Sequence, residues 1–367
     1  MKKVITTVGM SLWQNAKNKN VPLSNRLEEE NYNNRGQWST DIKKQEEKLN
    51  NWAKDNPNAC AEIASLIKIQ AELKEAIEVH LICTETILSR LCAKCIQDWF
   101  EGKENFEIKD PSVINGLQVK NRQRFEREGL SKLINKLETI AQNGYYWEDC
   151  VLNITGGYKA VIPFLTIMGQ VNEIPIYYIF EETEQESYEL IQIPNVPIDF
   201  KQEIFETHWK GFKLLDKDEL VENEKLSSAF LDKCSSCIVI VDTFCELNAL
   251  GKILWNKYNK GIFSFYSTKE IFSEIQKQSD IIRILQTKFW NDDIRENKTE
   301  IKQDHYVFDD GNNNNRIYYF ESEGDLYIYK TFESEEKAKA YISTPFKDNQ
   351  RQSFLKISEE FKIKKII

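Results

Sequence analysis

The chain has few of the features that mark membrane proteins, secreted proteins or nucleic-acid coats. Its 367 residues hold no apolar run long enough to cross a bilayer, and Lys2-Lys3 precedes only a short strand rather than a signal peptide. The formal net charge of −9 argues against a broad surface that coats nucleic acid. These absences predict a soluble cytoplasmic protein, with no membrane partner, in which any nucleic-acid contact is confined to a local basic pocket.

The eight cysteines also lack the spacing of a secreted disulfide framework, which predicts free thiols. Two C-x-x-C pairs, Cys92–Cys95 and Cys234–Cys237, have the spacing of zinc ligands. The gap between the pairs is far longer than a zinc ribbon allows, and the first pair falls in a helical pattern. We therefore predict buried thiols and neither a metal site nor a cofactor, with a four-thiolate zinc site as the alternative.

Among the features that are present, the most informative is an apolar strand that ends in a glycine turn. Residues 151–154 predict a buried strand, Thr155-Gly156-Gly157 ends it, and a helix is expected from Tyr158 onward, despite Pro163. Glycines let a backbone approach a phosphate, and the free amides and dipole of a helix start favour negative charge. Lys159 adds a cation, so the segment predicts an anion site. It is neither a Walker loop nor G-x-G-x-x-G, so nucleoside triphosphates and dinucleotides are not expected.

A second strand of this kind begins the chain, where an apolar segment runs into Gly9-Met10-Ser11-Leu12. Open α/β sheets bind ligands at the carboxyl ends of their parallel strands, so we expect the two turns to meet there. Strands alternate with helices over the first 195 residues, which implies a parallel sheet. The expected strands are 3–8, 78–84, 149–154 and 174–180, and the expected helices are 58–77, 86–98, 123–143 and 157–170. The polar stretch 13–56 is either a lid, a dimer contact or a solvated insertion.

The two turns together resemble the CRISPR-associated Rossmann fold (CARF) family, over roughly the first 180 residues. The resemblance rests on Thr-Thr-Val-Gly-x-Ser-Leu at 6–12 and Asn-Ile-Thr-Gly-Gly-x-Lys-Ala at 153–160. It implies a Rossmann-like sensor over 1–195 that acts in type III CRISPR antiviral defence. The sensor would be a homodimer that binds an activator, cyclic oligoadenylate, on its two-fold axis, with cyclic tetra-adenylate (cA4) as the expected ring. The implied ligand-binding residues are Thr7, Gly9, Met10, Ser11, Leu12, Asn153, Thr155, Gly156, Gly157 and Lys159. Whether this domain also degrades its ligand as a ring nuclease stays open.

Residues 196–265 form the second of three expected domains. Helices are predicted at 200–215, 226–231 and 247–258, with a strand at 238–241. This order resembles the helical or winged-helix connector of many CARF proteins, which implies a dimer scaffold. The alternative is a non-enzymatic CARF-regulated factor that touches DNA. A DNA-reading helix should be basic, and the helix 247–258 carries only Lys252 and Lys257.

Residues 266–367 should hold the output of the sensor, and two known output types fit poorly. HEPN ribonucleases need an arginine followed by four to six residues and then a histidine, and Arg295 lies ten residues before His305. His80 and His208 have no arginine close upstream. A metal-dependent PD-(D/E)xK nuclease would use E-x-K, present at 296–298 and 300–302, with an aspartate to hold Mg²⁺. These segments follow Asp292-Asp293 too closely for the usual hairpin, so this nuclease is the alternative.

A third output type accounts for more of the pattern. We expect a helix at 268–290, an antiparallel sheet of strands 304–308, 316–321 and 326–332, and a helix at 333–342. This α+β order, with arginine at the start of the middle strand, resembles the RelE/HigB-type mRNA interferases over roughly 75 residues. The resemblance implies an endoribonuclease that cleaves mRNA on the ribosome without metal, by attack of the ribose 2′-OH on the adjacent phosphate. The residues that it implies are Arg316, Lys337, Tyr341 and His305, with Lys302 and Lys330 close by. Residues 266–367 hold 17 Lys and Arg against 19 Asp and Glu, so strong binding to isolated RNA is not expected.

Overall fold

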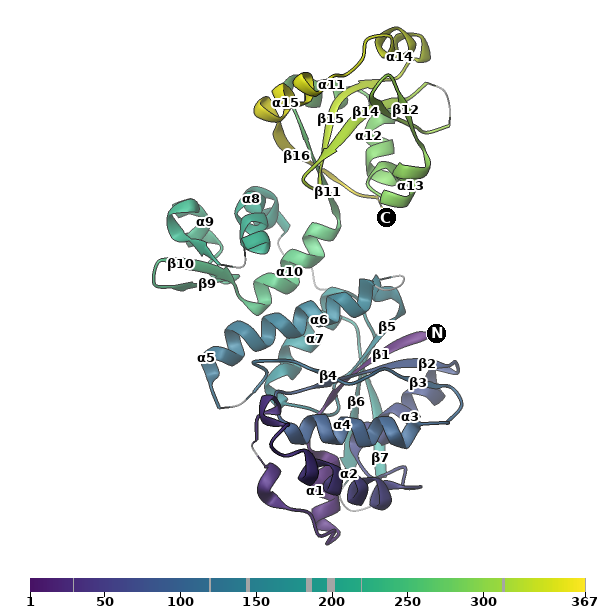
Figure 1. The fold of residues 1–367 in the computed structure, drawn as a ribbon, viewed down its shortest axis with the longest axis vertical. Coiled ribbons are helices and arrows are strands. Elements are labelled where there is room, and N and C mark those ends of the chain that lie inside the picture. The colour runs from purple at the N-terminus through teal and green to yellow at the C-terminus, as the bar shows by residue number, and fades with distance from the viewer. Residues whose placement is uncertain are drawn as a thin grey trace. The chain divides into compact units, whose positions relative to one another are not determined.

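The computed structural model describes residues 1–28, 30–118, 120–142, 146–182, 187–196, 202–218, 220–311 and 314–366. The chain divides into two compact units, Met1–Trp255 and Asn256–Ile367, which Figure 1 draws in one ribbon. This boundary lies ten residues before the predicted one at 265/266. The difference arises because Ile262–Ser267 is a strand inside the sheet of the second unit. None of the helices in these described ranges is long and apolar enough to cross a bilayer.

The first unit is built on a seven-stranded sheet, which confirms the predicted α/β class and its parallel core. The strand order is β3-β2-β1-β5-β6-β7, and β4 also pairs with β2. All pairs are parallel except β6 with β7. The strands are β1 (Lys2–Val8), β2 (Ile77–Cys83), β3 (Phe106–Ile108), β4 (Ser112–Val113), β5 (Cys150–Asn153), β6 (Ile176–Glu182) and β7 (Ser187–Ile193). The edge strand β7 and the short strands β3 and β4 were not predicted.

Helices cover both faces of this sheet, and each face has its own apolar core. Alternation along β1 divides the strand between them, because Val4 and Val8 face one core and Ile5 faces the other. Figure 1 shows α3 and α4 on one side of the sheet and α6 and α7 on the other. The helices are α1 (Ser11–Asn18), α2 (Ser39–Ala53), α3 (Ala61–Leu73), α4 (Ile87–Phe100), α5 (Arg122–Arg124), α6 (Leu130–Gln142) and α7 (Ile162–Val171). A π-helical turn, Phe125–Gly129, joins α5 to α6.

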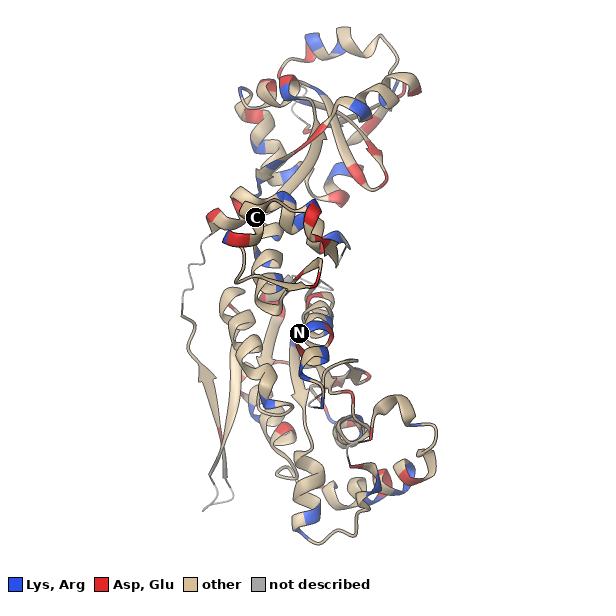
Figure 2. Cartoon of the chain, turned by 90° about the vertical axis from the view of Figure 1, so that its left-hand side faces the viewer, with Lys and Arg blue, Asp and Glu red and all other residues tan. Residues whose placement is uncertain are grey.

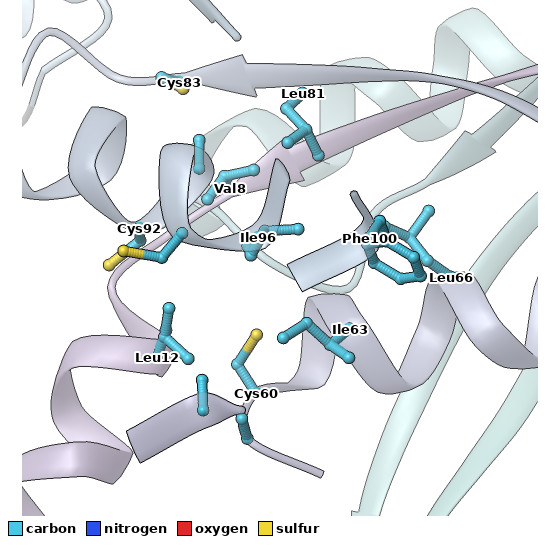
Figure 3. Close-up of a cluster of buried hydrophobic side chains, with 14 of the residues drawn as sticks. Val8, Leu12, Cys60, Ile63, Leu66, Leu81, Cys83, Cys92, Ile96 and Phe100 are labelled. Atoms are coloured by element: carbon cyan, nitrogen blue, oxygen red, sulfur yellow. The ribbon is translucent and has the colours of Figure 1, made fainter. Parts of the chain in front are cut away.

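The polar stretch 13–56 is not a solvated insertion. It contains α2, which packs on α4: Trp99 Nε1 donates to the Ala53 carbonyl at 3.0 Å, and Asn50 Nδ2 donates to Asp98 at 2.9 Å. Trp13 is buried in the core that Figure 3 shows around Leu12, Cys60 and Cys92. The polar composition of this stretch did not indicate the packing, because an amphipathic helix needs only a narrow apolar stripe to pack against a core.

The rest of the first unit is a small helical element with a three-stranded antiparallel sheet, β8-β10-β9. The predicted helices and the strand at 238–241 are present, although residues 200 and 201 lie outside the described residues. Strand β10 was missed because the turn at Asp242, with φ of 56°, brings the chain straight back along β9. The elements are α8 (Gln202–Asp218), β8 (Val221–Glu222), α9 (Ser228–Lys233), β9 (Ile238–Val241), β10 (Phe244–Leu247) and α10 (Ala249–Lys260), the last of which runs past the boundary at Trp255.

The second unit holds a six-stranded sheet in the order β12-β13-β14-β15-β11-β16. The three predicted strands and the last predicted helix are found at β13 (His305–Asp309), β14 (Arg316–Ser322), β15 (Asp325–Phe332) and α14 (Glu335–Ile342). The single helix expected at 268–290 is wrong, since Gln276-Lys277-Gln278 separates α11 from α12. The elements that were not predicted as such are β11 (Ile262–Ser267), α11 (Lys269–Ile275), α12 (Ser279–Ile284), the π-helical turn Leu285–Phe289, α13 (Asp292–Asn297), β12 (Thr299–Lys302), α15 (Asp348–Ile357) and β16 (Glu359–Lys364).

Candidate ligand site and candidate catalytic site

The two glycine turns meet at the carboxyl edge of the parallel sheet, as the sequence predicted. Strands β1 and β5 pair with Thr6 opposite Asn153, so the residues that follow them lie side by side. Thr7 Oγ1 donates to the Gly156 carbonyl at 2.5 Å, which ties one turn to the other. A Cβ on Gly9 would lie 2.9 Å from the Gly157 nitrogen. The structure therefore brings Thr7, Gly9, Gly156 and Gly157 into one site.

The glycines of this site are required by the packing of the chain itself. Gly157 has φ of +92°, and a Cβ there would lie 2.7 Å from Thr7 Cβ. A Cβ on Gly156 would fall on the carboxylate of Glu62, which comes from the first turn of α3. Close approach between three segments thus explains each glycine before any ligand is considered.

Several residues expected to touch the ligand instead brace the turn from within. Asn153 is buried, and its Oδ1 accepts from the Thr155 nitrogen at 3.3 Å and from Thr155 Oγ1 at 2.6 Å. Its Nδ2 donates to Ser65 Oγ at 2.7 Å. Leu12 is 1% exposed in the core, so its expected ligand contact is corrected to a packing role. The members of the predicted set that reach the surface most are Met10 and Lys159.

Glu62 is a site residue that the sequence did not reveal. Its Oε1 accepts from the Gly9 nitrogen at 3.0 Å, and its Oε2 accepts a short hydrogen bond from Ser11 Oγ. The side chain is only 1% exposed. An acidic residue in the first turn of a helix is common for reasons of helix dipole alone, so the sequence carried no sign of this contact. In the first turn, the Gly9 amide therefore already has a carboxylate partner.

The helix after the second turn starts later than predicted. A 3₁₀ turn, Lys159–Val161, follows Tyr158, and α7 begins at Ile162 with Pro163 in its first turn. Tyr158 itself packs edge-on against Phe125, with ring centroids 5.3 Å apart. Four residues therefore separate the glycines from the start of α7, which weakens the direct effect of the helix on an anion at the turn.

A cavity of about 470 Å³ opens beside the exposed residue of the first turn, Met10. Along its wall, Lys17 Nζ contacts Glu28 Oε1 at 2.7 Å, and the buried indole of Trp13 donates to the same oxygen at 3.3 Å. The lining residues are Met10, Trp13, Gln14, Lys17, Asn18, Glu28 and Leu88. The lining of this cavity therefore mixes apolar and polar side chains, and it shares Met10 with the first turn.

In the second unit, Arg316 and Tyr341 lie on one face of the sheet, around Tyr318. The Tyr341 ring is 5.2 Å from Tyr318 and 5.4 Å from Phe332, and Phe332 pairs with Arg316 across β14 and β15. Arg316 Nη1 donates to Asp309 Oδ1 at 2.8 Å and to the Asn315 carbonyl at 2.9 Å. Burial raises the pKa of Tyr341, so this phenol stays protonated at neutral pH.

His305 has a structural role, which corrects its expected place among the catalytic residues. It is 1% exposed. Nδ1 lies 2.7 Å from Tyr329 Oη, and Nε2 lies 2.7 Å from the Thr344 carbonyl. Its ring also stacks on Phe346, with centroids 5.8 Å apart. Both ring nitrogens are satisfied inside an aromatic core, so neither is available to move a proton to or from a substrate.

The three lysines of the expected catalytic set occupy different positions. Lys330 contacts Glu274 at 3.0 Å and lies 5.6 Å from the ring of Phe332, on the same face as Tyr341. Lys337 is exposed on α14, one residue before the buried Ala338, and Lys302 pairs with Glu300 on the edge strand β12. The structure therefore groups Lys330 with Arg316 and Tyr341 and leaves Lys302 on an edge.

The structure also locates the residues of the two metal-dependent alternatives, the PD-(D/E)xK nuclease and the four-thiolate zinc site. Glu300 and Lys302 lie on strand β12. Within the part of the chain that the structure describes, no group of three or more His, Cys, Asp or Glu side chains could hold a metal ion. All eight cysteines are buried and unpaired by disulfides, as predicted. Figure 2 shows basic and acidic residues interspersed along the second unit.

Comparison with known proteins gives one family match. Residues 57–196 match the family model described as CRISPR-associated protein (Cas_APE2256). No curated protein matches the chain. Among solved structures, Can2 from Sulfobacillus thermosulfidooxidans in complex with cyclic tetra-adenylate (cA4) aligns over 97% of this chain and 84% of its own, at 12% identity. The TM-score of that alignment is 0.26, too low to carry an argument. The family match runs from before α3 to the residues after β7, and it supports the CRISPR-associated part of the resemblance seen in the sequence.

Proposed function

We propose that the chain is a cyclic-oligoadenylate-activated effector of type III CRISPR defence. The observation that carries the proposal is the meeting of the turn at Gly9 with the turn at Gly156-Gly157, on the carboxyl edge of a parallel sheet. The second of these turns lies within the residues that match the CRISPR-associated family. In this proposal the first unit is the sensor, and the second unit is an endoribonuclease that needs no metal.

The ligand chemistry of the sensor follows from the exposed parts of the turns. A ring of adenylates brings several phosphates and bases to one site. Lys159 is an exposed cation beside the turn and would pair with a phosphate, and the cavity next to Met10 would take a base or ribose. A ring with two-fold symmetry presents the same groups twice, so two copies of the chain would bind it symmetrically.

The chemistry of the second unit is attack of a ribose 2′-OH on the adjacent phosphate. The bond from the 2′ oxygen to phosphorus forms, the bond from phosphorus to the 5′ oxygen breaks, and the 2′-OH proton passes to water. Negative charge builds on the phosphate oxygens in the transition state, and the Arg316 guanidinium would stabilise it. Within the described residues only Nη1 of this side chain is hydrogen-bonded, so Nε and Nη2 have donors for a phosphate. The protonated phenol of Tyr341 would donate to the leaving oxygen, and Lys330 and Lys337 would add positive charge. Helices α11 and α12 precede the antiparallel strands β13 to β15, with α13 and β12 between them, and helix α14 follows, which supports the proposal of a RelE-like domain.

A chain of contacts leads from the ligand turn to the connector element. Tyr158 packs on Phe125 in the π-helical turn, and Arg127 of that same turn pairs with Glu246 on β10. One helical turn further on, Lys252 Nζ donates to Ser131 Oγ at 3.1 Å. A ligand that moved Tyr158 would therefore displace groups in direct contact with the connector. This supports a sensor whose state is passed on along the chain.

The function is tested by adding cyclic tetra-adenylate and cyclic hexa-adenylate separately to the full chain. Naked RNA and translating ribosomes serve as two substrates, each with and without EDTA, with ribosome integrity checked. We expect cleavage of ribosome-bound mRNA only with the cyclic ligand, and expect cleavage to survive EDTA on any ribosome-free substrate that is cut. Loss of that cleavage, restored by Mg²⁺ or Mn²⁺, would favour the second candidate, a PD-(D/E)xK nuclease, which the strand position of Glu300 and Lys302 favours.

The role of Lys159 makes a separate prediction. Lys159→Ala should weaken cyclic oligoadenylate binding by about 1.5–3 kcal/mol, the usual worth of a charged hydrogen bond. Titration calorimetry would measure the change, with Lys54→Ala, another exposed lysine of the first unit, as the matched control. Equal affinities for Lys159→Ala and the parent chain would remove this side chain from the ligand site.

A further inference from the structure

We propose that Glu62 is a specificity-determining residue of the ligand site, which keeps simple phosphates away from the donors of the first turn. The inference rests on the proposed function and deepens it. It concerns which anions the two glycine turns accept. It adds a residue that neither the sequence pattern nor the family match places at this site.

The position of the Glu62 carboxylate carries the argument. It accepts from the Gly9 nitrogen at 3.0 Å and from the hydroxyl of Ser11, which are the donors that a glycine turn normally offers to a phosphate. On its other side, the carboxylate occupies the place of a Cβ at Gly156. An internal anion thus fills the space between the two turns, where an external one was expected.

The burial of Glu62 makes this arrangement permanent in the folded chain. The side chain is 1% exposed, and the helix that carries it packs through Ile63 and Leu66 into the core shown in Figure 3. A phosphate at the Gly9 amide would have to displace a carboxylate that is almost wholly buried. It would also lie within a few ångströms of a like charge, at a site where the effective dielectric constant is low.

The consequence is that the site selects ligands by how many contacts they make with it. A single phosphate meets a turn whose inner donors are taken and whose nearest fixed charge is negative. A ring of several adenylates can still bind, because it can use the outer surface of the turn, Lys159 and the cavity beside Met10 at once. Glu62 therefore lowers the affinity for every anion, and only a ligand with many contacts overcomes the loss.

Glu62→Gln separates this role from a merely structural one. The amide oxygen can accept from the Gly9 nitrogen as before, and the amide NH₂ can donate to Ser11 Oγ, so the geometry is kept while the charge is removed. If Glu62 only holds the turn in place through its hydrogen bonds, Glu62→Gln should leave anion binding unchanged or weaken it. A charge that excludes anions predicts tighter binding, by at least about tenfold for one like charge a few ångströms away.

The experiment measures the binding of inorganic phosphate and of cyclic tetra-adenylate to the full chain by calorimetry. We expect Glu62→Gln to gain at least about tenfold in affinity for inorganic phosphate and less for cyclic tetra-adenylate, which can bind at the outer surface of the turn. Glu62→Ala should also gain for inorganic phosphate, which covers the case in which one variant does not fold. The matched control is Glu72→Gln, an exposed glutamate on the same helix, which should leave both affinities unchanged.

The outcomes distinguish this inference from the proposed function. Unchanged or weaker phosphate binding in folded Glu62→Gln and Glu62→Ala overturns the role of Glu62, whatever the parent chain binds. A parent chain that ignores cyclic oligoadenylates, with a Glu62→Gln variant that gains phosphate, overturns the proposed ligand but supports Glu62 as the residue that excludes anions.

Discussion

Arg316→Ala should lower the ligand-activated cleavage rate by about 10²-fold or more, the usual cost of losing one transition-state donor. The side chain begins strand β14 on the face that also holds Tyr341, and its guanidinium can pair with two phosphate oxygens at once. Arg316→Lys keeps the positive charge but cannot pair with two phosphate oxygens at once. Its cleavage rate should therefore fall between the rates of the parent chain and of Arg316→Ala. Single-turnover cleavage of ribosome-bound mRNA would measure all three rates.

Two controls keep this prediction interpretable. Arg283→Ala changes an exposed arginine of α12 in the same unit and should leave the rate unchanged. Because Arg316 pairs with the partly buried Asp309, its loss also leaves a carboxylate without a partner, and a thermal melt must show that the variant is folded. The assignment is falsified if folded Arg316→Ala cleaves at the parental rate, and affinity for the cyclic ligand should stay intact in either case.

The parts of the fold that the sequence predicts are those in which a local pattern and its tertiary environment agree. Strands β1, β2 and β5 are short apolar runs next to helical patterns, and burial on both sides keeps them apolar. Strand β11 was not predicted, and the predicted boundary at 265/266 divided its residues, because its parallel partner, β15, lies some sixty residues further on. Nothing within the strand itself indicates that pairing. The same holds for α2, whose partner α4 is distant in the sequence.

The candidate sites show the same division. The meeting of the two glycine turns could be predicted, since parallel strands bring their carboxyl ends to one edge by rule. Glu62 could not, because its partners Gly9 and Ser11 lie more than fifty residues away and its own surroundings read as an ordinary helix start. His305 was misjudged for a related reason. The chemistry of its side chain suggested catalysis, but three elements (β14, β15 and α14) and the loop after α14 supply the aromatic rings and the carbonyl that enclose it.

The second large effect concerns Gly156, where the packing of the turn can be tested without any ligand. A Cβ at this position would fall on the Glu62 carboxylate, so Gly156→Ala must either push a buried charge out of its hydrogen bonds or distort the turn. Overpacking typically costs about 1–3 kcal/mol, and the loss of hydrogen bonds to a buried charged group adds a similar amount. We expect Gly156→Ala to lower the free energy of unfolding of the first unit by about 3 kcal/mol or more, measured in urea.

The matched control is Gly36→Ala, because a Cβ at Gly36 meets no atom within 4 Å and its φ is not positive. That variant should change the stability by less than about 0.5 kcal/mol. The double variant Gly156→Ala with Glu62→Ala should recover part of the loss, since removing the carboxylate makes room for the new methyl group. If the two changes were simply additive, the glycine would not be explained by Glu62, and the turn would have to owe its glycine to the ligand instead. The double variant thus decides whether the glycine motif that first suggested phosphate binding exists for the ligand or for the chain's own carboxylate.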